Sequence, residues 1–155
     1  MIYKYQVEGL KVQTGDLICT VDGGSNNIKG QFWRPIGKLL PGDVDHVAIY
    51  VGPNGRCVEA GAKGMVVAFE INENSWNSER MTEQRGMLID EIYGVAYPLE
   101  GKGLNEAQST RIRENVAAYC LAQIGKPYNL NFLNSSTEDA FYVVGLPIRH
   151  ISSRV

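Results

Sequence analysis

A histidine and a glutamate on two successive β-like segments are the side chains in this sequence best suited to acid–base chemistry. His46 begins the segment HVAIYV (46–51), and Glu59 lies in RCVEAG (56–61), after the four-residue stretch GPNG (52–55). Glycine and proline in that stretch predict a β-hairpin. A carboxylate that is hydrogen-bonded to one imidazole nitrogen fixes the tautomer and leaves the other nitrogen as a general base.

The expected hairpin register brings His46 and Glu59 to one face of the sheet. If GPNG forms the loop, Tyr50 faces Cys57 across the ladder. Ala48 then faces Glu59. Side chains alternate between the faces of a strand, so His46 and Glu59 form a diagonal cross-strand pair that long side chains can close. The alternative is a histidine on a sheet face and a solvated glutamate, without a catalytic role.

Further β-like segments surround the hairpin and predict a meander of strands. They are GDLICTV (15–21), GMVVAFEI (64–71) and IYGVAYPL (92–99). The stretch between 22 and 45 is rich in glycine, proline and asparagine, which predicts a long loop or lid. The polar stretch NENSWNSERMTEQRG (72–86) is interpreted as a surface connection.

One amphipathic helix is predicted over about 105–124. Asn105 followed by Gln108 resembles a capping box, and Gly125 and Pro127 indicate the end of the helix. Four apolar residues repeat at helical spacing in between: Ile112, Val116, Tyr119 and Cys120. A strand meander with a packed helix makes an α+β domain, and 155 residues suit a single domain.

Composition and cysteine usage narrow the classes of function. Hydrophobic residues make up 44% of the chain and charged residues 21%, with 15 basic and 17 acidic side chains, so no disorder and no nucleic-acid partner is expected. The cysteines Cys19, Cys57 and Cys120 are odd in number and unpatterned, which argues against disulfides or a zinc site. We therefore expect reduced thiols and no metal or other cofactor.

The location expected from the sequence is the cytoplasm. The first residues, MIYKYQVEGLKVQTGD, lack a basic start followed by an apolar core. No apolar run approaches membrane-spanning length, so no transmembrane segment is expected. An export leader removed before the first residue would leave the same sequence.

Five short motifs resemble, in order and approximate spacing, the YaeF/YiiX-like proteins. The motifs are GDLI, DHVAIYVG, CVEAGAKGMVV, IGKPYNLNF and EDAFY, and they extend from about Gly15 to Tyr142. These proteins are circularly permuted, papain-like relatives of the NlpC-type cell-wall amidohydrolases and of lecithin:retinol acyltransferase. The resemblance implies a permuted papain-like fold and a cysteine hydrolase that acts on amide bonds, such as those of peptides or cell-wall peptides, or on acyl bonds.

The resemblance also implies roles for individual residues. In that family the histidine of the H-V-x-I strand is the base and the glutamate of V-E-A orients it, so His46 and Glu59 are the candidate catalytic residues. Tyr128, the tyrosine of G-K-P-Y, and Asp45 are the candidate substrate-binding residues. The alternative for Tyr128 is a loop tyrosine that caps the core. The family's catalytic cysteine follows an aromatic pair near the C-terminus, and Val143 stands at that position.

Valine at position 143 removes the expected nucleophile. The family pattern is roughly Y-C-S-E/Q-L-V-W/Y-K-A-Y, whereas this chain has YVVGLPIRHI. Valine has no ionisable atom, so it cannot form an acyl-enzyme. A glycine and a proline in the tail also oppose the helix that should follow. The chain as written is therefore predicted to be inactive as a cysteine hydrolase.

A single inserted thymine after the Tyr142 codon would restore the family pattern. Val143 and Val144 are encoded GTN GTN, and the insertion gives TGT, a cysteine codon, and then NGT, which can encode serine. The shifted frame can continue as Cys-Ser-Arg-Leu-Thr-Tyr-Lys-Ala-Tyr, with poor fits at arginine and threonine. We hypothesise a one-base frameshift, natural or introduced, that makes 143–155 an atypical tail. Chance agreement through codon degeneracy is the alternative.

Two other classes of function stay open at the level of the sequence. A pseudoenzyme would keep the cleft and bind a small peptide, an amino acid or a lipid acyl group without turnover. An enzyme with a relocated nucleophile could use Cys57, on the His46 face, or Cys19. The alternative for both cysteines is a small buried hydrophobic side chain. The sequence indicates neither the substrate nor the oligomeric state.

Overall fold

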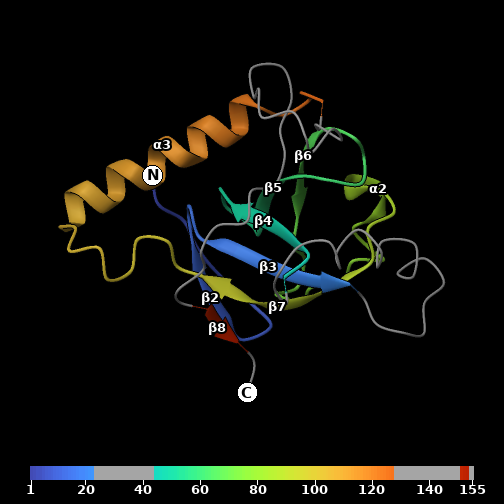
Figure 1. Ribbon diagram of the computed structural model, residues 1–155, viewed down its shortest axis with the longest axis horizontal. Coiled ribbons are helices and arrows are strands. Elements are labelled where there is room, and N and C mark those ends of the chain that lie inside the picture. The colour runs from blue at the N-terminus through green and yellow to red at the C-terminus, as the bar shows by residue number, and fades with distance from the viewer. Residues whose placement is uncertain (23–43, 128–150, 154–155) are drawn as a thin grey trace.

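The computed structural model describes residues 1–22, 44–127 and 151–153. These residues form an α+β structure with a six-stranded sheet, a two-stranded sheet and a long helix (Figure 1). Two of the predicted site residues, Tyr128 and Val143, lie outside the described residues, and so does the whole predicted loop apart from its two ends.

The larger sheet is antiparallel throughout and contains the predicted hairpin. Its strand order is β6-β5-β4-β3-β7-β8. The bounds are β3 (Leu17–Asp22), β4 (His46–Tyr50), β5 (Arg56–Ala60), β6 (Val66–Glu70), β7 (Asp90–Ala96) and β8 (Ile151–Ser153). Tyr50 pairs with Cys57, which confirms the predicted register of the hairpin.

A second, two-stranded sheet at the N-terminus was not predicted. Its strands are β1 (Lys4–Val7) and β2 (Leu10–Gln13), with Val7 opposite Leu10. The two loop residues, Glu8 and Gly9, both have positive φ, 49° and 84°, as a type I′ turn requires. Glutamate is an unusual choice for such a turn, so the segment lacks the Asn-Gly or Asp-Gly signature of a tight hairpin.

The two faces of the larger sheet pack against different elements. One face, here called the site face, presents Ala48, Tyr50 and Cys57, which pack with Val7 and Val12 of the small sheet. The other face, here called the helix face, packs against the long helix. Its buried apolar residues are Val51, Val58 and Val66 from the sheet and Ala117 and Cys120 from the helix.

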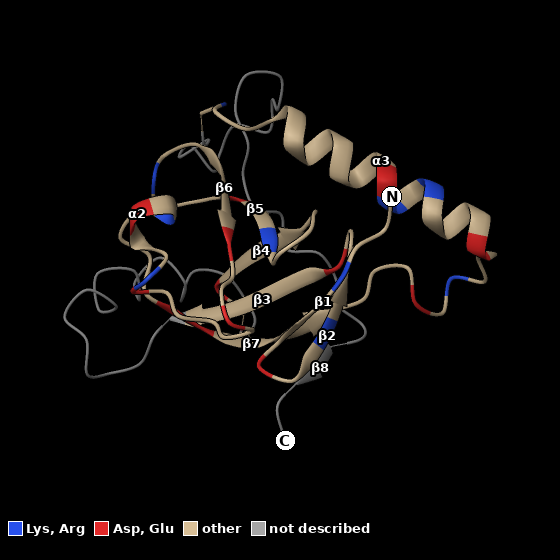
Figure 2. Ribbon diagram, turned by 180° about the vertical axis from the view of Figure 1, so that it is seen from behind, with Lys and Arg blue, Asp and Glu red and all other residues tan. Residues whose placement is uncertain are grey.

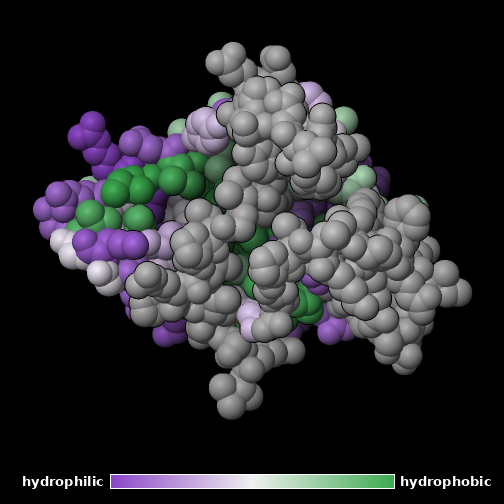
Figure 3. All heavy atoms as spheres, in the orientation of Figure 1, coloured by the Kyte–Doolittle hydropathy of each residue, from purple (hydrophilic) through white to green (hydrophobic). Residues whose placement is uncertain are grey.

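The long helix α3 (Glu106–Ala122) begins with the predicted capping box, in which Asn105 and Gln108 bond reciprocally. The predicted apolar stripe is only partly correct, because the side chains of Ile112 and Tyr119 are 37% and 59% exposed. Figure 3 shows hydrophobic residues exposed along this helix. Charged residues of both signs lie on its first half (Figure 2).

The side of α3 that faces the sheet includes a buried arginine, which the predicted apolar stripe did not contain. The side chain of Arg113 is 7% exposed, and its Nη1 donates to Asp16 Oδ1 at 2.6 Å and to the Thr14 carbonyl at 2.8 Å. The ion pair therefore joins α3 to the turn between β2 and β3. In the described part of the chain, no helix is long and apolar enough to cross a membrane.

The segment 72–86 was predicted to be a surface connection, and that prediction is only partly correct, because exposed residues alternate with buried ones. Trp76, Met81 and Arg85 are buried, and the segment ends in the short helix α2 (Thr82–Arg85) beside β6. Polar residues dominate the segment, but its largest side chains point into the core on the site face. Hydropathy alone misses this because a buried arginine counts as polar even when its charge is fully paired.

Candidate active site

The predicted pair of His46 and Glu59 is formed. His46 is the first residue of β4, Glu59 lies on the neighbouring strand β5, and His46 Nε2 is 3.0 Å from Glu59 Oε2. The diagonal cross-strand contact expected from the hairpin register is therefore confirmed. A Cβ added at Gly61 would lie 3.1 Å from His46 Cε1, so glycine at this position leaves room for the ring.

The two members of the pair differ in their access to solvent. The His46 side chain is 11% exposed and that of Glu59 is fully buried. The imidazole therefore keeps a small exposed surface, whereas the carboxylate has none. An ionised carboxylate only accepts hydrogen bonds, so His46 donates from Nε2 and keeps the lone pair on Nδ1. Nδ1 is the atom that can take up a proton.

Arg85, the last residue of α2, holds the other side of the Glu59 carboxylate. Its Nε donates to both carboxylate oxygens at 3.0 Å, and its Nη2 donates to Oε2 at 2.8 Å. The guanidinium and the carboxylate form a charge-assisted, multidentate pair, which is the strong form of this interaction. The helix ends at Gly86, whose φ of 84° and ψ of −170° are a backbone conformation that glycine adopts readily and other residues rarely do.

Asp90, the first residue of β7, holds the far side of Arg85. Arg85 Nη1 donates to Asp90 Oδ1 at 2.8 Å and Nη2 donates to Oδ2 at 2.9 Å. The Thr20 hydroxyl donates to Oδ2 at 2.7 Å, and the Trp76 indole donates to Oδ1 at 3.1 Å. Both oxygens of this buried carboxylate are thus satisfied by two donors each.

Two aromatic rings complete the surroundings of Arg85. Its Cζ lies 4.7 Å from the ring centroid of Phe69 and 4.7 Å from that of Trp76. The two rings meet edge to face, 5.8 Å apart. The cation is therefore in contact with the negative faces of two rings and has no exposed surface.

Together, His46, Glu59, Arg85 and Asp90 are here called the relay cluster. Burial alone would raise the pKa of Glu59, but the hydrogen bond and the charge of His46, followed by the charge and the hydrogen bonds of Arg85, outweigh burial and lower it. Burial opposes the charge of Arg85 as well, yet its bonds to Asp90 and the charges of both carboxylates raise its pKa. With both carboxylates and the guanidinium ionised, the three groups carry a net charge of −1 beside His46.

The lowered pKa of Glu59 predicts a specific loss of stability in acid. Its ionised form stabilises the native state at pH values above its ordinary pKa of 4.5, and this contribution is lost as the pH falls through the lowered value. We expect the free energy of unfolding, measured by urea denaturation, to decrease below pH 4.5 more steeply for the native chain than for Glu59→Gln. Equal slopes would contradict the ionisation assigned to Glu59.

Of the predicted substrate-binding residues, Asp45 alone is described. It precedes β4, is exposed, and its backbone N–H donates to the Thr20 carbonyl at 3.0 Å. Asp45 is therefore next to His46 in the chain and at the edge of the site face. Tyr128 and Val143 lie outside the described residues, so their placement relative to His46 stays a prediction.

The cysteines do not have the surroundings of a reactive thiol. Cys57 is fully buried on the site face, where burial raises the pKa of its thiol well above the ordinary range. Cys19 is fully buried on the opposite face, and burial raises its pKa to about 11. A nucleophilic thiol needs partial exposure and a lowered pKa. Both cysteines instead fit the alternative of small buried hydrophobic side chains.

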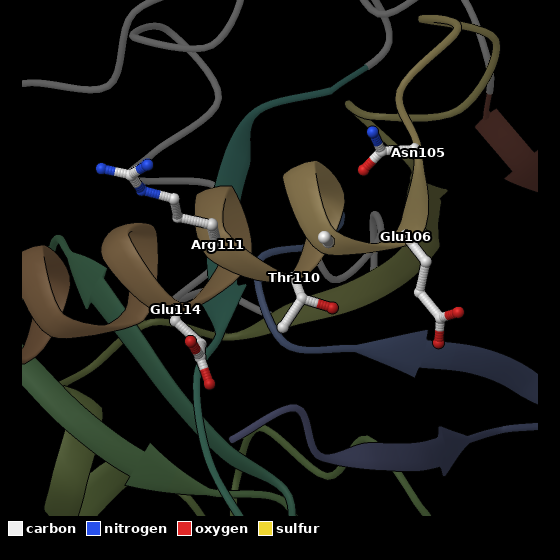
Figure 4. Close-up of a pocket in the computed structure, with 6 residues that line it drawn as sticks. Asn105, Glu106, Thr110, Arg111 and Glu114 are labelled. Carbon is white, nitrogen blue, oxygen red and sulfur yellow. The ribbon is translucent and has the colours of Figure 1, made fainter.

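Among the described residues, no group of three or more His, Cys, Asp and Glu side chains could hold a metal ion. An open depression lies at the start of α3, on the helix side of the sheet, and is lined by Asn105, Glu106, Ala107, Thr110, Arg111 and Glu114. The labelled side chains point in different directions and do not converge on a common point (Figure 4).

Comparisons of the chain with protein-family models, with curated proteins and with solved structures found no match. The resemblance to the YaeF/YiiX-like proteins therefore stays a prediction. What the structure adds is the relay cluster. Sequence reasoning identified His46 and Glu59 but missed Arg85 and Asp90, for which no motif or periodicity gave a signal.

Proposed function

We propose that this chain is a cysteine-hydrolase-like protein of the permuted papain type, with His46 as the base and Glu59 as the residue that orients it. The observation that carries the proposal is the 3.0 Å contact between His46 Nε2 and a fully buried Glu59, which also pairs with Arg85 at 2.8 Å. A solvated surface glutamate, the alternative left open by the sequence, would have neither the burial nor the guanidinium partner.

The pair supplies the proton transfers of acyl-group chemistry. In a relative with a cysteine at the position of Val143, Nδ1 of His46 would take the thiol proton, and the thiolate would attack an amide or ester carbonyl. His46 would then return the proton to the leaving amine or alcohol as the thioester forms. Water would hydrolyse the thioester with His46 again as the base. Throughout, Glu59 would stabilise the charged imidazolium through Nε2.

A ligand-binding role without turnover is the second candidate. It is favoured by the absence of a suitable nucleophile among the described residues, where all three cysteines are buried and burial raises the pKa of each. In this form the site would bind a small peptide, an amino acid or a lipid acyl group. Recognition and bond cleavage use different groups, so the loss of one does not require the loss of the other.

The chain as written is expected to show no turnover of chromogenic amide or ester substrates above the rate in buffer, because Val143 supplies no nucleophile. The assay would compare the native chain with Cys57→Ser and Val143→Ala. All three should be equally inactive. Turnover that is lost in Cys57→Ser and kept in Val143→Ala would instead show a relocated thiol and would overturn the proposal.

A further inference from the structure

We propose that Arg85 is a positioning residue for His46 that acts through Glu59. By holding the carboxylate ionised and in one orientation, Arg85 fixes His46 in the tautomer that carries its proton on Nε2 and keeps Nδ1 free. The geometry that supports this is described above, while its catalytic consequence rests on the proposed function. No contact between Arg85 and a substrate is required.

The Glu59 carboxylate has no free rotation. Its two oxygens accept four hydrogen bonds, three from Arg85 and one from His46 Nε2. Oε2 accepts three of these bonds and Oε1 accepts one, with the Arg85 Nε–H shared between the two oxygens, so both oxygens are held by a donor. Any rotation of the Glu59 side chain would break several charge-assisted bonds in a region without solvent.

The Arg85 side chain is itself held in place by its neighbours. Asp90 binds its two terminal nitrogens, and Phe69 and Trp76 contact its plane. Asp90 is in turn fixed by Thr20 and Trp76. A planar guanidinium can bind two carboxylates on its two edges at once, whereas the compact ammonium of lysine cannot. The position therefore requires arginine and not only a positive charge.

Without the guanidinium of Arg85, Glu59 would lose the cation that favours its ionised form. Glu59 would then be a buried carboxyl close to a second one, Asp90, and both burial and like charge favour the protonated form. A protonated Glu59 can donate its hydrogen bond to Nε2 of His46. The imidazole would then carry its proton on Nδ1, the nitrogen that has to be free for general-base catalysis. Loss of Arg85 would thus invert the tautomer without any direct contact.

Nitrogen NMR of the imidazole tests this proposal without any need for turnover. His150 is the only other histidine, so a His150→Gln background leaves the ring of His46 as the single imidazole. Under alkaline conditions, in which the ring is neutral, we expect Nε2 to be protonated, with a slowly exchanging N–H proton, and Nδ1 to be unprotonated. In Arg85→Met, which has neither the charge nor the N–H donors of the guanidinium, we expect loss of the slow N–H signal and, in the pH range in which Glu59 carries its proton, a shift of both nitrogens toward the opposite tautomer.

Arg113→Met is the matched control, since Arg113 is also buried and also paired with a carboxylate, Asp16, but on the helix face. Both variants should be less stable than the parent, and Arg113→Met should keep the parent spectrum of His46. An unchanged tautomer in folded Arg85→Met overturns the proposal, and so does the same change in both variants, because general loosening would then be the cause.

If Arg85→Met does not fold, Arg85→Gln replaces it. Glutamine also lacks the charge but can donate a hydrogen bond to the carboxylates, so a change in the same direction supports the proposal, and an unchanged spectrum overturns it. The outcome is independent of whether the chain descends from a hydrolase. If the proposed function is wrong, a cysteine introduced at position 143 should not be unusually reactive, while the tautomer of His46 should be unaffected.

Discussion

Replacing Arg85 with methionine is expected to lower the free energy of unfolding by about 3–5 kcal/mol. Methionine has a similar length but no charge, so Glu59 and Asp90 would be left buried side by side without a cation. Breaking a buried ion pair from one side is costly because the remaining charge has lost its water and its partner. Urea denaturation of the native chain and of the variant at neutral pH measures the difference.

Arg80→Met is the matched control for this experiment. Arg80 pairs with Glu73 at 3.1 Å, but both side chains are largely exposed, at 68% and 77%. Exposed ion pairs contribute roughly 0–1 kcal/mol, so the loss in Arg80→Met should not exceed that amount. Similar losses in the two variants would mean that the cluster around Arg85 is not the buried, fully paired network described above.

The second large effect is expected from replacing the tail. A chain in which residues 143–155 carry the sequence of the other reading frame, beginning Cys-Ser-Arg-Leu-Thr-Tyr-Lys-Ala-Tyr, should contain a thiol of unusual reactivity. An ordinary thiol with a pKa of about 8.5 is roughly 3% ionised at pH 7, so full ionisation raises the thiolate fraction about 30-fold. Lower intrinsic nucleophilicity reduces the gain in alkylation rate to about two- to threefold.

The point variant Val143→Cys separates a frameshift from ordinary divergence. If the whole tail is out of frame, the helix that should position the thiol and lower its pKa is missing, and this variant should react like an ordinary thiol. The tail replacement should also raise stability, since its leucine and tyrosine spacing suits a core-facing helix. A reactive Val143→Cys would favour a simple substitution. The nucleotide sequence across the Tyr142 codon provides an independent check.

The part of the site that local rules control was predictable from the sequence. Glycine and proline between two β-like segments set the loop of the hairpin, and the loop length set the register. The alternation of side chains then placed His46 and Glu59 on one face. The capping box at Asn105 was predictable for the same reason, because its two partners are three residues apart. These features involve few residues and short separations.

The missed features depend on contacts between distant segments. Arg85 reaches Glu59 across 26 residues of sequence, and Arg113 reaches Asp16 across 97. Charged residues of this kind score as exposed in any hydropathy pattern, and only the fold reveals that their charges are paired. The apolar stripe predicted for α3 was wrong at Tyr119 for this reason. The helix buries Arg113 and Ala117, and Tyr119 is exposed.

The dependence of thiol alkylation on His46 tests most directly whether His46 and Glu59 form the base half of a cysteine-hydrolase centre. The measurement compares the alkylation rate of the tail-replaced chain at neutral pH with that of the same chain carrying His46→Gln. Cys19, Cys57 and Cys120 are replaced by alanine in both chains. We predict that the loss of His46 reduces the rate about two- to threefold, to that of an ordinary thiol. Equal rates with and without His46 would contradict the proposal.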